Sequence, residues 1–265
     1  MKKKIWITVS VLMVALLSLG ILRYKNTSNN IETVKEGEET ETHLANSDDE
    51  IVDSETDKKG NKKLTTSLTD LNEIILSSQS TDEIYITDIL EVGEEEEVKP
   101  GIYDMEILGG GGNIFGERAS VPMHINWLGG AKGSDYGYPS VIRVILFEGD
   151  ELEFHEIGKV KFTAVPEKVT PSQELRIGEY IVGRDVPVGK YKLATNMELD
   201  EEFDNLGWQI TSYDLDTEKS KQQSLTANNP DVALNLKEGQ IISIFYDNTD
   251  FESDGDAPRL ILKEM

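Results

Sequence analysis

The spacing of hydrophobic positions divides this chain into four kinds of sequence. Residues 5–22 are an 18-residue apolar run without a charge, which as a helix spans about 27 Å, close to the hydrocarbon thickness of a membrane. Residues 26–63 are acidic and nearly lack aromatic and branched apolar residues, so we expect a disordered spacer. Residues 64–82 carry leucine and isoleucine at helical spacing and predict one short helix. From residue 83 onward the pattern is that of β-strands.

Several short segments of this last region alternate apolar and polar residues, as half-buried strands do. Turn residues separate them every 8 to 15 positions, a spacing typical of antiparallel sandwiches and small open barrels. The turn Glu148–Asp150 is interpreted as the tip of a hairpin. The sequence therefore predicts an all-β fold. The predicted strands are 83–90, 103–107, 141–147, 152–154, 160–165, 180–182, 191–193, 208–210, 232–236, 241–246 and 260–262.

The β-rich region contains an internal repeat. Val-Gly, Pro-Gly-x-Tyr and Glu-Gly elements of the first part return in the second, and Gly149 follows Tyr103 by 46 positions while Gly239 follows Tyr191 by 48. Glycine, proline and aromatic residues recurring at matched spacing mark a duplicated structural unit. We therefore predict two tandem β-modules, residues 83–168 and 173–265, joined by a proline-containing linker.

The N-terminal segment, residues 1–25, is predicted to anchor the protein in a membrane. Lysines precede the apolar run, so its N-terminus is expected in the cytoplasm and the modules outside the cell. Trp6 and Tyr24 flank the run, where amphipathic rings favour the membrane interface. A cleaved signal peptide is the alternative, because Ser18-Leu19-Gly20 is an acceptable small-x-small cleavage site. The uncleaved single-pass anchor is favoured because the apolar run continues beyond that site.

Charge and cysteine content limit the possible partners and the kind of organism. The net charge is −24, and the first 25 residues contribute five positive charges and no acid, which leaves −29 on the remainder. Such a surface repels nucleic acid phosphates, so nucleic acid is excluded as a partner. The chain has no cysteine, so disulfides and a lipid-modified cysteine are excluded. An extracellular chain without disulfides is typical of a bacterium that does not rely on them.

The second repeat resembles an uncharacterised extracellular β-module of Gram-positive bacteria, whose signature is Val-Gly-x-Asp-Ile-Pro-Ala-Gly-x-Tyr. Val182-Gly183, Asp185-Val186-Pro187, Gly189 and Tyr191 match it, as does the later Leu236-x-Glu238-Gly239-Gln240. The first repeat departs from it, with a longer acidic connection and one residue fewer between proline and glycine. The resemblance implies a β-rich module outside a Gram-positive cell and carries no catalytic residue.

No motif indicates catalysis. The glycine runs 109–112 and 129–133 lack the Gly-Lys-Ser/Thr order of a phosphate loop. There is no Gly-x-Ser-x-Gly elbow and no thiol nucleophile. Paired carboxylates are too plentiful to single out a glycosidase pair, so hydrolysis of wall polymer remains only a remote alternative. We expect a protein that is not an enzyme and needs no cofactor.

One acidic segment resembles the front of a calcium-binding loop. Asp250, Glu252, Asp254 and Asp256 alternate around a glycine, and Asp247 could add an oxygen. The bidentate glutamate of a full calcium loop is missing, because Ile261 stands at that position. An acidic surface loop is therefore favoured, with weak calcium binding as the alternative function.

The insert between Gly109 and Pro139 supplies the predicted binding residues. It is rich in glycine and carries Trp127, Tyr136 and Tyr138. Exposed aromatic side chains bind sugars and proteins at low entropic cost, whereas the alternative is a loop held to the sheet by its own aromatics. The sequence thus predicts a binding or structural protein of the cell envelope, with a wall glycan or a protein as partner.

Overall fold

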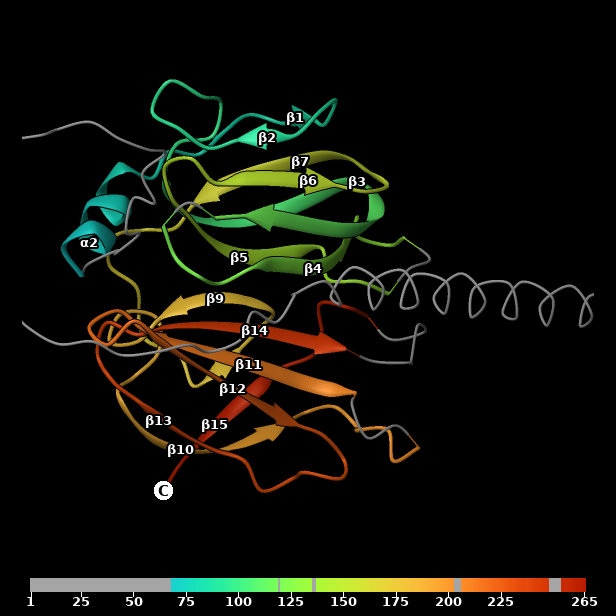
Figure 1. Cartoon of the computed structure of the whole chain (residues 1–265). Coiled ribbons are helices and arrows are strands. Elements are labelled where there is room, and N and C mark those ends of the chain that lie inside the picture. Colours follow the sequence, from blue (N-terminus) through green and yellow to red (C-terminus); the bar gives the residue numbers. More distant parts are fainter. Residues whose placement is uncertain (1–67, 119, 135–136, 203–205, 248–253) are drawn as a thin grey trace, which may run out of the picture. The chain divides into compact units, whose positions relative to one another are not determined.

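The computed structural model describes residues 68–118, 120–134, 137–202, 206–247 and 254–265 (Figure 1). The predicted membrane segment 5–22 and the predicted spacer 26–63 lie outside the described residues. Within the described ranges, no helix is long and apolar enough to cross a membrane. The described residues belong to one compact unit, residues 60–265, which is built from β-strands and a single described helix, α2 (Leu68–Ser77). The predicted all-β class is confirmed.

The N-terminal half, residues 84–164, forms two sheets that share one long strand. Its first sheet has the order β1-β7-β3-β5, and its second has the order β2-β6-β3-β4. The N-terminal part of β3 pairs with β5 and β7, and its C-terminal part pairs with β4 and β6. The strands are β1 (Ile84–Tyr85), β2 (Leu90–Glu91), β3 (Gly101–Glu117), β4 (Ile125–Gly130), β5 (Val141–Leu146), β6 (Glu151–Phe154) and β7 (Ile157–Ala164).

The C-terminal half, residues 174–264, has the same strand order. One of its sheets runs β8-β15-β10-β13, which corresponds to β1-β7-β3-β5. The other runs β9-β14-β11-β12, which corresponds to β2-β6-β3-β4. The strands are β8 (Glu174–Leu175), β9 (Gly178–Ile181), β10 (Gly189–Thr195), β11 (Gly207–Asp214), β12 (Lys219–Leu225), β13 (Ala233–Leu236), β14 (Ile241–Asp247) and β15 (Leu260–Glu264).

The halves differ in how the chain passes between sheets. In the C-terminal half β10 and β11 are separate strands, whereas in the N-terminal half β3 runs through both sheets. The pairing of β3 with β7 is irregular at Gly109 and Gly110. Gly110 has φ +81°, and a Cβ there would lie 2.0 Å from the carbonyl oxygen of Glu156. The glycine run therefore allows a bent strand and a close backbone approach, and the expected loop at 109–112 is instead sheet.

The turn Glu148–Asp150 connects two sheets instead of closing a hairpin. Strand β5 before it pairs with β3 and β9, whereas β6 after it pairs with β2 and β3. In the C-terminal half β13 and β14 likewise lie in different sheets. The expected hairpin is therefore wrong, because the turn sequence fixes the local bend and long-range pairing decides which sheet each strand joins.

The turn between β5 and β6 and the turn between β13 and β14 are held by equivalent hydrogen bonds. The amide of Gly149 donates to the carbonyl of Val92 over 2.8 Å, and the amide of Gly239 donates to the carbonyl of Val182 over 3.0 Å. Val92 and Val182 each form an isolated parallel bridge, to Val98 and to Val186. In each half, the valine lies in the turn before β3 or β10, and the glycine lies in the turn that leads from one sheet to the other. The hydrogen bond between them joins these two turns.

In each half, a repeated tyrosine forms a hydrogen bond to the turn that precedes its own strand, β3 or β10. The hydroxyl of Tyr103 donates to the carbonyl of Lys99 over 2.8 Å, and that of Tyr191 donates to the carbonyl of Pro187 over 3.1 Å. Both rings are at most 1 % exposed and belong to one large hydrophobic core. Each tyrosine therefore anchors the core and caps a turn four residues before it.

A second hydrophobic cluster lies where α2 meets both halves. Leu71 and Ile74 of α2 pack in one cluster with Ile145 and Phe147 of the N-terminal half and with Ile241 of the C-terminal half. Leu71 is fully buried. The short helix predicted from its leucine and isoleucine spacing is confirmed within residues 68–77, and it covers the junction of the two halves.

The two halves also share hydrogen-bonded backbone at one point. Strand β5 pairs in parallel with β9 through Arg143 and Gly178, which makes the sheet continuous from one half to the other. Gly178 has φ +131°, and a Cβ there would lie 2.4 Å from the carbonyl oxygen of Arg143. A glycine is needed at this contact because any side chain would push the two strands apart.

Candidate functional site

The predicted aromatic binding residues are not brought together as an exposed cluster. Trp127 lies in β4, is 2 % exposed and belongs to the main hydrophobic core. A side chain this buried packs the core instead of contacting a partner, which corrects the expectation for Trp127. Tyr138 is half-buried, and Tyr136 lies outside the described residues.

The predicted calcium residues are divided between several environments. Asp256 directs its carboxylate to Ser140, accepting from the amide over 2.8 Å and from the hydroxyl over 2.6 Å. Asp254 accepts from the amide of Asp256, and Asp247 ends β14. Asp250 and Glu252 lie outside the described residues. In the part of the chain that the structure describes, no three acidic or histidine residues form a metal-binding group.

A groove over the second sheet of the N-terminal half is a candidate site. It has a volume of about 470 Å³ and lies on the outward faces of β3, β4 and β6. Two of its apolar lining residues are exposed, Phe115 at 38 % and Ile89 at 48 %, whereas Ile125 is buried. We call this site the sheet-face groove; its main lining side chains are Ile89, Phe115, Glu117, His124, Glu151 and Glu153.

The alternation of β-strands explains why these side chains share one face. In β6, Glu151 and Glu153 are exposed while Leu152 between them is buried. In β3, Phe115 and Glu117 are exposed beside the buried Ile114. The register pairs Phe115 with Glu153, so an aromatic ring and a carboxylate stand next to each other in the groove.

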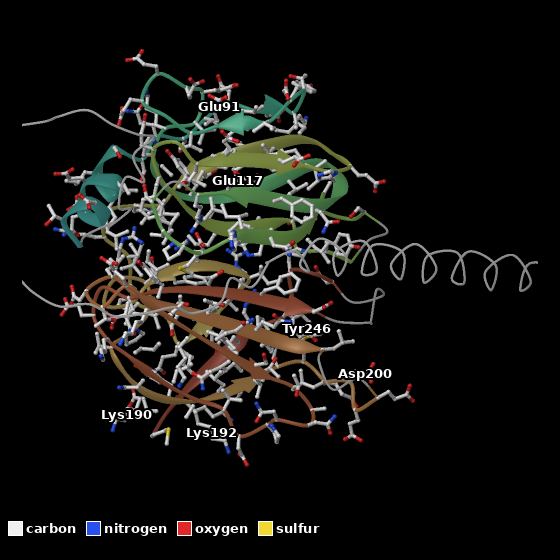
Figure 2. The ribbon with its side chains drawn as sticks, in the orientation of Figure 1. Glu91, Glu117, Lys190, Lys192, Asp200 and Tyr246 are labelled. Atoms are coloured by element: carbon white, nitrogen blue, oxygen red, sulfur yellow. The ribbon has the colours of Figure 1, made fainter. Side chains whose placement is uncertain are left out.

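A row of three glutamates crosses this face. Glu151 is the direct cross-strand partner of both Glu91 in β2 and Glu117 in β3. All three side chains are exposed, and Figure 2 labels Glu91 and Glu117 on the N-terminal half. Like charges directly opposite each other destabilise a sheet, so this row concentrates negative potential at one edge of the groove.

A histidine lies beside the aromatic ring. The imidazole of His155 contacts Phe115 edge to face, with ring centroids 5.4 Å apart, and lies 3.1 Å from a carboxylate oxygen of Glu153. The groove thus presents an apolar surface and several carboxylates side by side.

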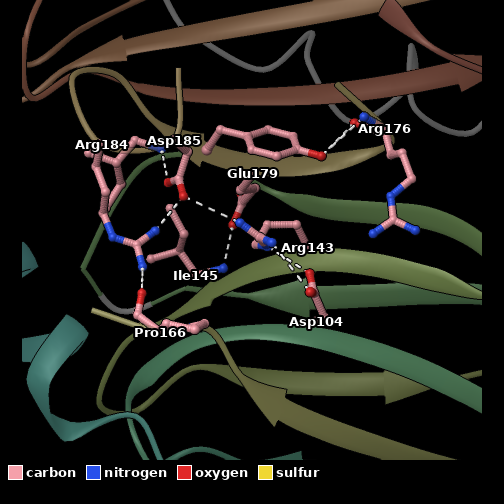
Figure 3. Close-up of polar contacts among 10 residues, drawn as sticks. Asp104, Arg143, Ile145, Pro166, Arg176, Glu179, Arg184 and Asp185 are labelled. Carbon is pink, nitrogen blue, oxygen red and sulfur yellow. Dashed lines mark hydrogen bonds and ion pairs between the residues drawn. The ribbon is translucent and has the colours of Figure 1, made fainter. Parts of the chain in front are cut away.

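A second feature is a network of charged side chains that joins the two halves (Figure 3). Arg143 of β5 forms ion pairs with Asp104 of β3 at 2.7 Å and with Asp185 of the C-terminal half at 3.3 Å. Arg184 pairs with the same Asp185 and donates to the carbonyl of Pro166 over 2.6 Å. The side chain of Asp185 is 3 % exposed.

Burial sets the ionisation of this network. Burial raises the pKa of Asp185 above its ordinary value, although the Ile181 amide and two arginines oppose the shift. Burial also raises the pKa of Tyr180 to about 12, and it lowers the pKa of Arg184. Burial alone would lower the pKa of Arg143, but the hydrogen bond and charge of Asp104 raise it overall.

A buried ion pair crosses between the halves, and its arginine also lies 3.8 Å from the buried carboxylate of Asp150. Arg118, which follows β3, contacts Glu179 of β9 at 2.7 Å, and their side chains are 2 % and 0 % exposed. The same Glu179 oxygen accepts from the amide of Ile145 over 3.1 Å, and Arg118 donates to the carbonyl of Ile145. Removing one partner of such a pair leaves an uncompensated charge in the interior.

Sequence reasoning missed both the groove and the charge network. Neither Arg118 nor Glu179 stands in a recognisable motif, and their meeting depends on how two distant strands pack. The alternation of Glu151, Leu152 and Glu153 does place both acids on one face, so this part of the groove could be predicted from the sequence. Comparisons with family models, curated proteins and solved structures return no match.

Proposed function

We propose that this chain is a membrane-anchored, non-catalytic binding protein of the cell envelope of a Gram-positive bacterium. In this proposal residues 5–22 hold it in the membrane with the N-terminus inside, and residues 26–63 act as a spacer. The two halves are tandem copies of one extracellular β-module, 83–168 and 173–265. Support for the duplication comes from the equal strand order and the repeated tyrosine turns.

The sheet-face groove is the proposed contact surface, and its exposed aromatic and aliphatic side chains are the observation that carries the proposal. Phe115 and Ile89 are 38 % and 48 % exposed within a hollow of about 470 Å³. Hollows of this size that combine apolar side chains with a few polar groups are typical of binding sites. This surface replaces the loop around Trp127 as the site of partner binding.

Topology and contact are tested together in intact Gram-positive cells that carry the full chain. A photoreactive phenylalanine analogue at position 115 is expected to give a cross-linked product, and external protease is expected to remove a C-terminal tag. The matched control places the same analogue at Val188, which is 52 % exposed on the C-terminal half. Cross-linking equal at both positions, or a tag protected until the cells are opened, would contradict the proposal.

A further inference from the structure

The partner of the sheet-face groove can be specified further from its charge, and this step rests on the function proposed above. We infer that the groove binds an extended basic polypeptide segment in which a lysine or arginine and an apolar residue stand two positions apart. Three features support this chemistry: the row of glutamates, the exposed apolar side chains beside it, and the acidic character of the whole chain.

The glutamate row favours a cationic ligand. Glu91, Glu151 and Glu117 stand opposite one another across three neighbouring strands, so each repels the next. A ligand with positive charges spaced along its length would relieve this repulsion while gaining ion pairs. The net charge of −24 would also steer such a ligand toward the protein and repel an acidic one.

The apolar side chains indicate a peptide in preference to a metal ion or a small polyamine. Phe115 lies beside Glu153 in the register, so a lysine or arginine paired with that carboxylate would also contact an aromatic ring. The volume of about 470 Å³ accommodates several side chains. In an extended segment the side chains of residues i and i+2 share one face, so a basic and an apolar residue two positions apart would lie one over the carboxylates and the other on Ile89 and Phe115.

The test uses the full chain in zwitterionic lipid nanodiscs, with empty nanodiscs as the baseline. Fluorescence anisotropy measures binding of a labelled peptide, Arg-Ser-Leu-Ser-Lys, whose first, third and fifth side chains share one face when it is extended, and of its acidic analogue, Glu-Ser-Leu-Ser-Glu. The basic peptide is expected to bind and the acidic one is not. Raising the salt concentration should weaken binding because exposed charges are screened beyond about 10 Å at 0.1 M.

Two pairs of variants locate the site. The double variant Glu117→Gln/Glu151→Gln is expected to weaken binding about tenfold, since each exposed ion pair contributes up to about 1 kcal/mol. Its control, Glu174→Gln/Glu264→Gln, makes the same charge change at exposed positions of the C-terminal half and should leave binding unchanged. Phe115→Ser should also weaken binding, whereas Val188→Ser should not. Circular dichroism melting confirms that each variant is folded.

Each failure has its own meaning. Equal binding of both peptides, or equal loss in the two double variants, overturns the inference. Binding of spermine that matches the peptide and is unchanged by Phe115→Ser identifies a small-cation site and also overturns it.

If cross-linking from position 115 succeeds on cells while the basic peptide does not bind, the proposed function stands and its cationic partner is wrong. If the peptide binds as expected and cross-linking fails, the chemistry of the groove stands and the envelope role falls.

Discussion

A tyrosine ring lying on a glycine is the smallest structural device that recurs in both halves. A Cβ at Gly101 would lie 2.5 Å from the hydroxyl oxygen of Tyr103, and one at Gly189 would lie 3.0 Å from that of Tyr191. The rings cannot move away easily, because both are buried in the core. These glycines are therefore selected for space, and their tyrosines for packing and a hydrogen bond.

Gly101→Ala is expected to lower the free energy of unfolding by about 1–3 kcal/mol, because the new methyl group overpacks the buried ring. Gly189→Ala should cost less, since its contact is longer. The control is Gly158→Ala, where a Cβ would meet nothing within 4 Å. Urea unfolding of the full chain measures all three. Equal stability of Gly101→Ala and Gly158→Ala would show that the ring does not require the glycine.

At the scale of single elements, alternating or clustered apolar residues predict most of the strands, but β4 is missed and the segment predicted as one strand, 83–90, holds only β1 and the first residue of β2. The pattern missed β12, Lys219–Leu225, because this strand is largely exposed on both faces and is defined by its pairing with β11. It also interpreted 109–112 as loop, because glycine lowers strand propensity while permitting the bend in β3. An exposed Trp127 is likewise a wrong prediction from the sequence, because this residue lies in the same glycine-rich insert and yet belongs to β4.

The helix α2 shows what local periodicity does predict. Its spacing identified a helix, and the structure shows that Leu71 is buried while Leu76 is 69 % exposed. The packing partners could not be predicted, because the cluster that receives Leu71 draws on both halves and on strands far apart in the sequence.

Leu71→Ala is expected to destabilise the full chain by about 2–5 kcal/mol, the usual cost of a buried leucine. Leu76→Ala removes the same atoms from an exposed position of the same helix and should change stability by no more than about 0.5 kcal/mol. Thermal and urea unfolding provide the comparison. Equal stability of the two variants would show that the burial of Leu71 at the junction does not stabilise the protein.

At the scale of the whole described unit, the two halves are joined by three kinds of contact. One backbone pair connects β5 with β9, the cluster around α2 supplies apolar packing, and ion pairs such as Arg118–Glu179 lie in the interior. Buried charges tolerate few arrangements, since each needs its partner in place. We therefore expect this network to favour one fixed packing of the two halves.

The coupling between the halves is tested through this buried pair. Arg118→Met leaves two buried carboxylates, Glu179 and Asp150, without their countercharge and is expected to cost about 3–5 kcal/mol. The double variant Arg118→Met/Glu179→Gln removes one of these two charges and keeps an acceptor for the amide of Ile145, while Asp150 keeps its hydrogen bond from the amide of Phe147, so it should recover at least about 1 kcal/mol. The control is Lys192→Met, which breaks an ion pair with Asp231 whose side chains are 54 % and 80 % exposed, and it should cost less than about 1 kcal/mol.

Calorimetry adds a readout that stability alone does not give. The wild-type chain should melt in one transition, because the halves share a core, a sheet and the buried charges. In Arg118→Met the junction is weakened more than either half, so the transition should broaden or divide in two, and the double variant should narrow it again. The single variant Glu179→Gln completes the comparison. If the costs of Arg118→Met and Glu179→Gln simply add in the double variant, Arg118 and Glu179 act independently, and the ion pair is not what holds the halves in register.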